Sequence, residues 1–146
     1  MKDTQTINAI IDALYDTISG PAGDRDWNRF RSLFFPGAHL IRTSIAPDGT
    51  PQASVMTVET YEQDTGDFFR RESFYEAETT HHIDHFGNVA HVFSTYEARH
   101  ERNEARPFKR GINSIQLFRD GIRWWVVSIL WDNEREDNPI PVEYLP

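Results

Sequence analysis

The sequence contains no cysteine, and this absence excludes every function that needs a thiol. The chain can form no disulfide scaffold, no thiol nucleophile and no thiolate metal site. It also has no apolar run close to the roughly 18 residues that a membrane-spanning helix needs, and residues 1–5 do not open a signal peptide. We therefore expect a soluble cytoplasmic protein with no membrane partner.

Positive charge is also scarce. Lys and Arg number 15 against 23 Asp and Glu, which gives a formal net charge of −8. Proteins that bind nucleic acid draw much of their affinity from Lys and Arg side chains that displace counterions. The phosphate-binding loops and dinucleotide fingerprints that hold common cofactors are missing as well. We expect neither a nucleic-acid partner nor a cofactor.

Apolar and aromatic residues are plentiful, at 38% and 13% of the 146 residues. This content suffices for a hydrophobic core, and the length is typical of one domain. Near the end of the chain, Asn138-Pro139-Ile140-Pro141 prevents a regular helix. We expect a single domain over residues 1–146, with a core at 6–134 and an irregular tail at 135–146.

Three helices are expected in the N-terminal half of the chain. Apolar residues at steps of three and four predict a helix over residues 6–18. Asp24 or Asp26 can cap a second helix that ends at Pro36, and Thr57 can cap a third that runs to about Phe69. Alternating and β-rich segments predict strands at residues 39–46, 52–56, 74–86, 89–101, 108–118 and 122–133. This order favours an α+β fold with helices on one face of a mostly antiparallel sheet.

The last predicted strand is apolar on both faces. In the run from Trp124 to Trp131, both alternating sets of side chains are largely hydrophobic, whereas a sheet with one buried face would leave the second set polar. A second copy of the chain could cover the outer face. We therefore expect a homodimer through the sheet.

Several short motifs accompany this pattern of helices and strands. They are Gly23-Asp24-Arg25-Asp26-Trp27, Phe35-Pro36-Gly37-Ala38-His39-Leu40, Gly87-Asn88-Val89-Ala90-His91-Val92, Arg110-Gly111-Ile112-Asn113-Ser114-Ile115-Gln116-Leu117 and Asp120-Gly121-Ile122-Arg123-Trp124-Trp125. Over residues 6–134 the chain resembles the nuclear transport factor 2-like superfamily, in its SnoaL-like and ketosteroid-isomerase-like branch with many uncharacterised bacterial members. The resemblance implies a cone-shaped curved sheet of about six strands that encloses a pocket with the three helices. It selects no function, because the superfamily includes isomerases, dehydratases, cyclases, hydrolases and binding modules.

Strand alternation predicts which side chains face that pocket. The Gly87-Asn88 loop pairs Phe86 with Val89 and His81 with Ser94, and paired residues share a face. The resemblance implies that the face with Ser94 points inward. The expected inward set is Thr79, His81, Ile83, His85, Ala90, Val92, Ser94, Tyr96, Ile112, Ser114, Gln116, Phe118, Trp125, Val127, Ile129 and Trp131. A slip of one residue would exchange each of these for its neighbour.

The resemblance to ketosteroid isomerases suggests candidate catalytic groups. Members of that family use a helix-one tyrosine and an acid on the penultimate strand as oxyanion donors, with an aspartate on the first strand as base. Tyr15 matches the tyrosine, whereas Ser114 stands at the acid position and Arg42 at the aspartate position. Steroid isomerase activity is therefore not expected. Arg42 would favour an anionic ligand, unless it pairs with Glu59 or Glu97.

Histidines cluster in the predicted strand at residues 74–86. His81 and His85 would lie about 13 Å apart along a strand, which is too far for one metal ion, so no metal site is expected. An imidazole titrates near neutral pH, and His81 could act as an acid or base beside Ser94 and Tyr96. The alternative is a solvated histidine with no catalytic role.

Two functions remain open from the sequence. The first is a cofactor-free isomerase, dehydratase or cyclase with Tyr15, His81 and Ser114 as catalytic residues. The second is a non-catalytic dimeric module that binds a small apolar or anionic molecule or another protein. In either case the ligand-binding residues would be Arg42, Ser94, Tyr96, Gln116 and Trp131, although Tyr96 and Trp131 could equally be core residues.

Overall fold

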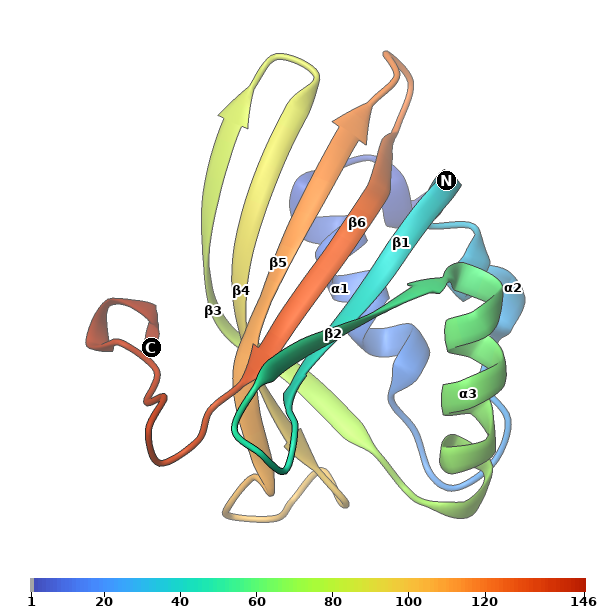
Figure 1. Ribbon diagram of the computed structural model, residues 1–146. Helices are drawn as coiled ribbons and strands as arrows, with labels where there is room; N and C mark the ends of the chain where they lie inside the picture. The colour runs from blue at the N-terminus through green and yellow to red at the C-terminus, as the bar shows by residue number, and fades with distance from the viewer. Residues whose placement is uncertain (1) are drawn as a thin grey trace.

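The computed structural model describes residues 2–146 and contains a six-stranded sheet with three α-helices (Figure 1). The helices are α1 (Ile7–Ile18), α2 (Trp27–Arg31) and α3 (Val58–Arg71). The strands are β1 (Phe34–Ile45), β2 (Pro51–Thr57), β3 (Tyr75–Phe86), β4 (Val89–Arg99), β5 (Lys109–Arg119) and β6 (Trp124–Asn133). Two short 3-10 helices, η1 (Lys2–Thr4) and η2 (Val142–Tyr144), lie near the ends of the chain. Among the described residues, no helix is long and apolar enough to cross a membrane.

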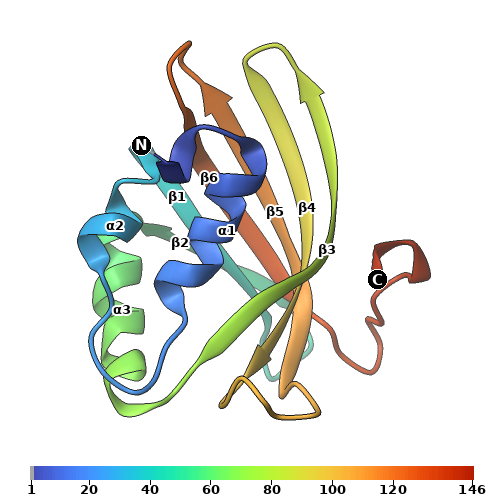
Figure 2. The same ribbon diagram turned by 180° about the vertical axis from the view of Figure 1, so that it is seen from behind.

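The sheet is open and strongly curved, with the strand order β2-β1-β6-β5-β4-β3. All neighbouring strands are antiparallel except β1 and β6, which run parallel. The three helices lie on one side of the sheet, and the segment after β6 lies on the other (Figure 2). The expected α+β architecture of a curved, mostly antiparallel sheet with three helices is confirmed.

Local signals in the sequence explain two of the helices. The Thr6 side chain accepts a hydrogen bond from the backbone N–H of Ala9 at the start of α1, and Thr57 does the same for Thr60 at the start of α3. The apolar face of α1 is buried against the sheet through Ile10, Ile11, Leu14 and Tyr15. The predicted apolar spacing of α1 and the predicted Thr57 cap of α3 are therefore confirmed.

The second helix is shorter than expected. It ends at Arg31, and Phe34 already belongs to β1, where it pairs with Val126 of β6. Pro36 and Gly37, which were expected to end the helix, lie inside β1. The register of the β1/β6 ladder shifts between Phe34 and His39, and this irregularity allows a proline within the strand.

The β3/β4 hairpin has the predicted register. The predicted register of β5 against β4 was wrong by one residue. His81 pairs with Ser94 as expected, whereas Ser94 pairs with Asn113 on β5 rather than with a residue of the predicted set. The inward side chains of β5 are therefore Asn113, Ile115 and Leu117, in place of Ile112, Ser114, Gln116 and Phe118. The connection between β4 and β5 is long, so it does not determine the register as a two-residue loop does.

Two bulges change the alternation further. The β3/β4 ladder shifts between Glu78 and Thr80, so Glu78 rather than Thr79 pairs with Tyr96 and shares its inner face. The β5/β6 ladder shifts next to Gln116, so the first inward residues of β6 are the buried Trp124 and Val126 in place of Trp125 and Val127. Beyond this bulge, Ile129 and Trp131 point inward as predicted.

Candidate functional site

A cavity of about 280 Å³ lies between the concave face of the sheet and the helices. Its walls are mostly aromatic and aliphatic side chains from the three helices, the sheet and the residue before β3, including Phe30, Phe68, Phe69, Phe74, Ile129 and Trp131. Charged and polar side chains also line it: Tyr15, Arg42, Tyr61, Asp64, Thr65, Glu76, Tyr96, Lys109 and Asn113. An apolar cavity with a few converging polar groups is the usual form of a small-molecule site.

Tyr15 projects from α1 to the inner face of the sheet. Its hydroxyl lies 2.6 Å from Ser94 Oγ, and the Asn113 amide donates a hydrogen bond to it over 3.0 Å. Ser94 is fully buried on β4 and Asn113 is its neighbour on β5. Burial and the nearby Glu76 carboxylate raise the pKa of the Tyr15 phenol well above its usual range. Tyr15 is therefore a neutral hydroxyl, held by two partners at the cavity wall.

Glu76, near the start of β3, places a carboxyl group in the cavity. Desolvation raises its pKa from the usual 4.5 to about 7, while Lys109 and the Asn113 amide act in the opposite direction. A carboxyl that titrates near neutral pH in an apolar cavity is typical of a general acid or base. Glu76 is the principal residue that sequence reasoning missed, because only the bulge at Thr79 brings this part of β3 to the inner face.

Two cations line the same cavity. Arg42 of β1 lies with its guanidinium 5.7 Å from the Trp131 ring, and Lys109 of β5 has its ammonium 5.6 Å from the Phe74 ring. Within residues 2–146, neither forms an ion pair with a carboxylate; Glu97, one of the expected partners of Arg42, pairs with Arg99 at 3.0 Å. Burial lowers the pKa of Lys109, because water no longer stabilises its charge.

Comparison with known proteins was informative only at the level of structure. No family model and no curated protein matches the sequence. A Nostoc punctiforme protein of unknown function with a cystatin-like fold matches with a TM-score of 0.65 and 9% identity, covering 90% of this chain and 96% of its own. A nuclear transport factor 2-like protein of unknown function from Silicibacter pomeroyi matches with a TM-score of 0.58 and 10% identity, covering 88% and 92%. A Shewanella frigidimarina protein provisionally assigned as a ketosteroid isomerase matches at 0.55 and 12%, covering 84% and 91%.

This chain has the nuclear transport factor 2-like fold. The expected resemblance is therefore confirmed as a fold, and these low identities carry no activity from one protein to another. The cavity side chains come from α1, α2, α3 and strands β1, β3, β4, β5 and β6, together with Phe74 and Phe108 next to β3 and β5.

Four of the predicted site residues line the cavity, namely Tyr15, Arg42, Tyr96 and Trp131. Ser94 lies directly behind the Tyr15 hydroxyl. Ser114 and Gln116 were predicted to face inward, and this was wrong because of the register of β5. The Ser114 hydroxyl instead lies 3.0 Å from His91 Nε2 on the outer face, and Gln116 is exposed. Asn113 takes the inward position next to Tyr15 that was expected for Ser114.

His81 lies beside Ser94 as expected, although it is not part of the cavity wall. Its Nδ1 is 2.7 Å from Glu78 Oε1, and its side chain is 27% exposed. The same Glu78 accepts a hydrogen bond from Ser94 through its other oxygen. His81 is therefore connected to Tyr15 by way of Glu78 and Ser94, with no direct contact with the cavity.

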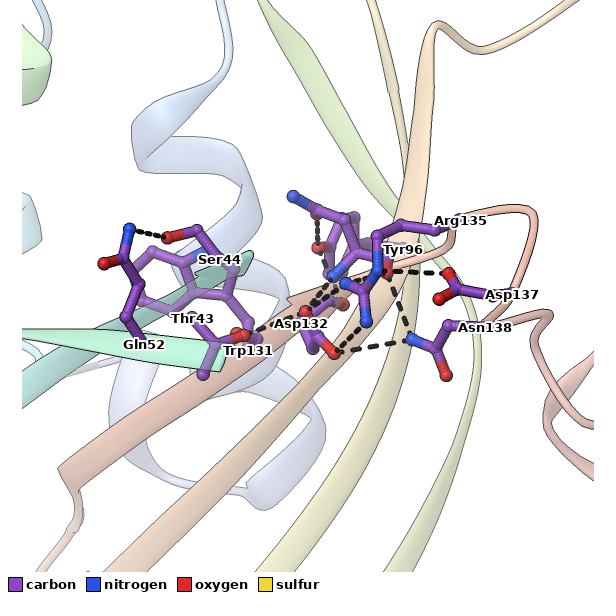
Figure 3. A network of polar contacts seen from close by, with 10 residues as sticks. Thr43, Ser44, Gln52, Tyr96, Trp131, Asp132, Arg135, Asp137 and Asn138 are labelled. Carbon is purple, nitrogen blue, oxygen red and sulfur yellow. Dashed lines mark hydrogen bonds and ion pairs between the residues drawn. The ribbon is translucent and has the colours of Figure 1, made fainter. Parts of the chain in front are cut away.

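A polar network lies at the end of β6, next to the cavity residues Tyr96 and Trp131 (Figure 3). The Tyr96 hydroxyl donates to Asn133 Oδ1 over 2.5 Å. Asp132 accepts from Thr43 of β1 and from Arg135 and Asn138 of the tail. Because these bonds join β1, β4, β6 and the tail, they position Tyr96 and Trp131 against the cavity.

No group of three or more His, Cys, Asp or Glu side chains that could hold a metal ion occurs between residues 2 and 146. The polar groups of the cavity are two carboxyls, three phenols, a threonine hydroxyl, an amide and two cations. This set can bind an anionic oxygen and move a proton.

Proposed function

We propose that this protein binds a small, largely apolar organic molecule with one acidic oxygen group in the cavity and catalyses a proton transfer on it. Isomerisation, dehydration and cyclisation are reactions of this class. Glu76 is the proposed proton carrier, and Arg42 and Lys109 are the proposed ligands of the anionic group. Tyr15 and Asn113 provide a neutral polar contact between them.

The observation that carries this proposal is the position of Glu76. Its carboxyl lies in a cavity with mostly apolar walls and has a pKa of about 7. Near neutral pH such a group is present in both protonation states, so it can accept a proton and return it. A carboxylate that served only for solubility would lie in water with its usual pKa.

The unpaired cations support an anionic ligand. Placing a guanidinium and an ammonium in an apolar cavity is costly unless an anion compensates them. Glu76 and Asp64 are the carboxylates that line the cavity. Glu76 attracts Lys109 electrostatically, but neither carboxylate forms an ion pair with Arg42 or Lys109 in the described part of the chain. A carboxylate, enolate or phenolate on the ligand would complete this charge arrangement, and the aromatic walls would take a flat ring.

A binding experiment tests the proposal. We expect aromatic and alicyclic carboxylic acids to raise the melting temperature of the wild-type protein, and the corresponding neutral amides to have little effect. Arg42→Gln should weaken binding of an acid that stabilises the protein by about 10- to 100-fold, as expected for loss of a charged hydrogen bond. Isothermal titration calorimetry measures this change.

The exposed Arg106 provides a matched control. Arg106→Gln removes the same charge without touching the cavity and should leave the affinity unchanged. Equal stabilisation by acids and amides, or equal losses in the two arginine variants, would contradict an anion site at Arg42. A ligand that binds at Arg42 and is never converted would favour a non-catalytic binding module.

We also propose that a second copy of the chain covers part of the outer sheet face. Val55, Val127 and Leu130 are 62%, 38% and 42% exposed there, on the half of the sheet formed by β1, β2 and β6. The tail already covers part of the other half, where Tyr144 packs on Phe93 with ring centroids 5.0 Å apart. The exposed apolar half therefore supports a homodimer interface.

Light scattering tests the homodimer. We expect a dimer at micromolar concentration for the wild-type protein and a monomer for Leu130→Lys, because a charge in an apolar interface is costly. Ile122→Lys changes a residue that is 68% exposed in the turn between β5 and β6, and it should leave the dimer intact. A monomeric wild-type protein would refute the interface.

A further inference from the structure

A continuous chain of hydrogen bonds runs from the cavity to the surface. It begins at the Tyr15 hydroxyl, which lies 2.6 Å from Ser94 Oγ. Ser94 Oγ donates to Glu78 Oε2 over 2.5 Å, and Glu78 Oε1 lies 2.7 Å from His81 Nδ1. Tyr15 is 7% exposed and Ser94 is fully buried, whereas the His81 side chain is 27% exposed. The four residues therefore connect a buried phenol to an imidazole that water can reach.

The direction of each hydrogen bond follows from the number of protons available. The Ser94 hydroxyl has one proton, and an ionised Glu78 can only accept, so Ser94 donates to Glu78. Ser94 must then accept from Tyr15, whose single proton points along the chain. The oxygen of Tyr15 remains free to accept, and the Asn113 amide donates to it. In this state Tyr15 is an acceptor toward the cavity and cannot donate to a ligand.

Protonation of Glu78 would reverse this order. A neutral carboxyl can donate a hydrogen bond to Ser94, and Ser94 can then donate one to Tyr15. The Tyr15 hydroxyl is then free to point its proton toward the cavity. The bulge at Thr79 makes this chain possible, because it brings Glu78 to the inner face opposite Tyr96 and beside Ser94. A serine at position 94 is small enough to be fully buried and still link the two residues.

We infer that Tyr15, Ser94, Glu78 and His81 form a proton relay that changes Tyr15 from a hydrogen-bond acceptor into a donor when a proton passes from His81 to Glu78. The protons balance along the chain. The His81 imidazolium gives its Nδ1 proton to Glu78 Oε1. The neutral carboxyl then turns so that this proton faces Ser94, and the Ser94 and Tyr15 hydroxyls turn with it. Glu78 gives the proton to Ser94, Ser94 gives its own to Tyr15, and Tyr15 gives its own to an oxygen of the ligand. His81 is left neutral and takes up a proton from water.

This relay adds a second proton route to the cavity. Glu76 exchanges a proton with the ligand directly, whereas the relay would supply one to a ligand oxygen near Tyr15. An isomerisation or dehydration needs a base at one atom of the substrate and an acid at another. The catalytic use of the relay thus rests on the proposed acid–base function, while the coupling of Tyr15 to His81 is a property of the free protein.

Other ionisable groups also act on Tyr15 and have to be separated from the relay. Glu76 and Glu78 of β3 both raise the pKa of Tyr15, and the phenols of Tyr15 and Tyr96 interact electrostatically. Glu76 titrates near neutral pH, so it would mimic a response to His81. A Glu76→Gln background removes this contribution while leaving all four relay residues in place.

Nuclear magnetic resonance of the free protein tests the relay without a ligand. In the Glu76→Gln protein, labelled with ¹³C at tyrosine Cζ and ¹⁵N in histidine, the Tyr15 and His81 signals should shift together as the pH changes. In the additional Ser94→Ala variant, the His81 signal should still shift and the Tyr15 shift should be lost. A Tyr15 shift that persists in Ser94→Ala would reveal a through-space effect of charge and overturn the relay.

A second variant keeps the test decisive if Ser94→Ala fails to fold, since Ser94 is fully buried. His81 is partly exposed, so His81→Gln should fold, and the Tyr15 signal should no longer shift at the pH at which it shifts with His81 present. A Tyr15 signal that titrates unchanged in His81→Gln, or one that does not move in the Glu76→Gln protein, would overturn the inference. Because no ligand is involved, these results stand apart from success or failure of the proposed function.

Discussion

Replacement of Gly111 by alanine should lower the free energy of unfolding by about 3 kcal/mol, the upper part of the usual range for overpacked cores. Gly111 lies on β5 opposite Tyr96, and a Cβ atom there would collide with the Tyr96 hydroxyl and with the backbone carbonyl of Asp132. Tyr96 cannot move away easily, because its hydroxyl is bonded to Asn133. Chemical denaturation followed by tryptophan fluorescence measures the loss.

Gly66 provides the matched control for this substitution. It lies inside α3, where an added Cβ would contact the Trp27 ring at 3.6 Å, an ordinary van der Waals distance. Alanine is favoured over glycine in a helix interior by up to about 1 kcal/mol. Gly66→Ala should therefore stabilise the protein while Gly111→Ala destabilises it. If the two variants were equally stable, the close contact of Gly111 with Tyr96 would not hold in solution.

Glu76→Gln should make the protein more stable than the wild type at neutral and basic pH, by about 3 kcal/mol. The pKa of Glu76 is about 7 in the folded protein, against a usual 4.5. Below pH 4.5 both folded and unfolded states hold the proton, so the carboxyl has no effect on the difference between them. Between pH 4.5 and 7 only the unfolded state releases it, and wild-type stability falls as the pH rises. The difference corresponds to about 3 kcal/mol above pH 7, and glutamine does not titrate.

Urea denaturation of both proteins at several pH values tests this expectation. The extra free energy of unfolding of Glu76→Gln over the wild type should be absent near pH 4, increase through pH 6 and level off above pH 7. Glu59→Gln removes an exposed carboxylate from α3 and should show no such increase. A constant difference between Glu76→Gln and wild type across this range would mean that Glu76 does not titrate near neutral pH.

The Gly111→Ala effect depends on a strand register that the sequence did not predict. Gly111 belongs to a motif that supported the fold, but its contact with Tyr96 follows from the register between β4 and β5. Residues 100–108 separate these strands, and many registers are compatible with a connection of this length. The two-residue Gly87-Asn88 turn, in contrast, allows few geometries, and the predicted pairing of His81 with Ser94 was confirmed.

Glu76 illustrates a second limit. Strict alternation of side chains from His81 predicts that Thr79 points inward and that Glu76 and Glu78 point outward. Any prediction that uses strand alternation alone gives the same result. The bulge at Thr79 reverses that assignment for Glu76 and Glu78 together. A bulge is favoured by the twist and curvature of the whole sheet, so no local pattern in residues 75–80 predicts it.

The sequence alone indicated the α+β class, because apolar periodicity, helix caps and tight turns act over a few residues and are visible in the chain. The family resemblance implied the curved, cone-shaped sheet. The sequence also determined that Tyr15, Arg42, Tyr96 and Trp131 lie on elements that can reach a common interior. Only the tertiary structure decided which carboxyls accompany them. The bulge at Thr79 brings Glu76 to the cavity and Glu78 to Ser94, and desolvation by the surrounding helices and strands then raises the pKa of Glu76.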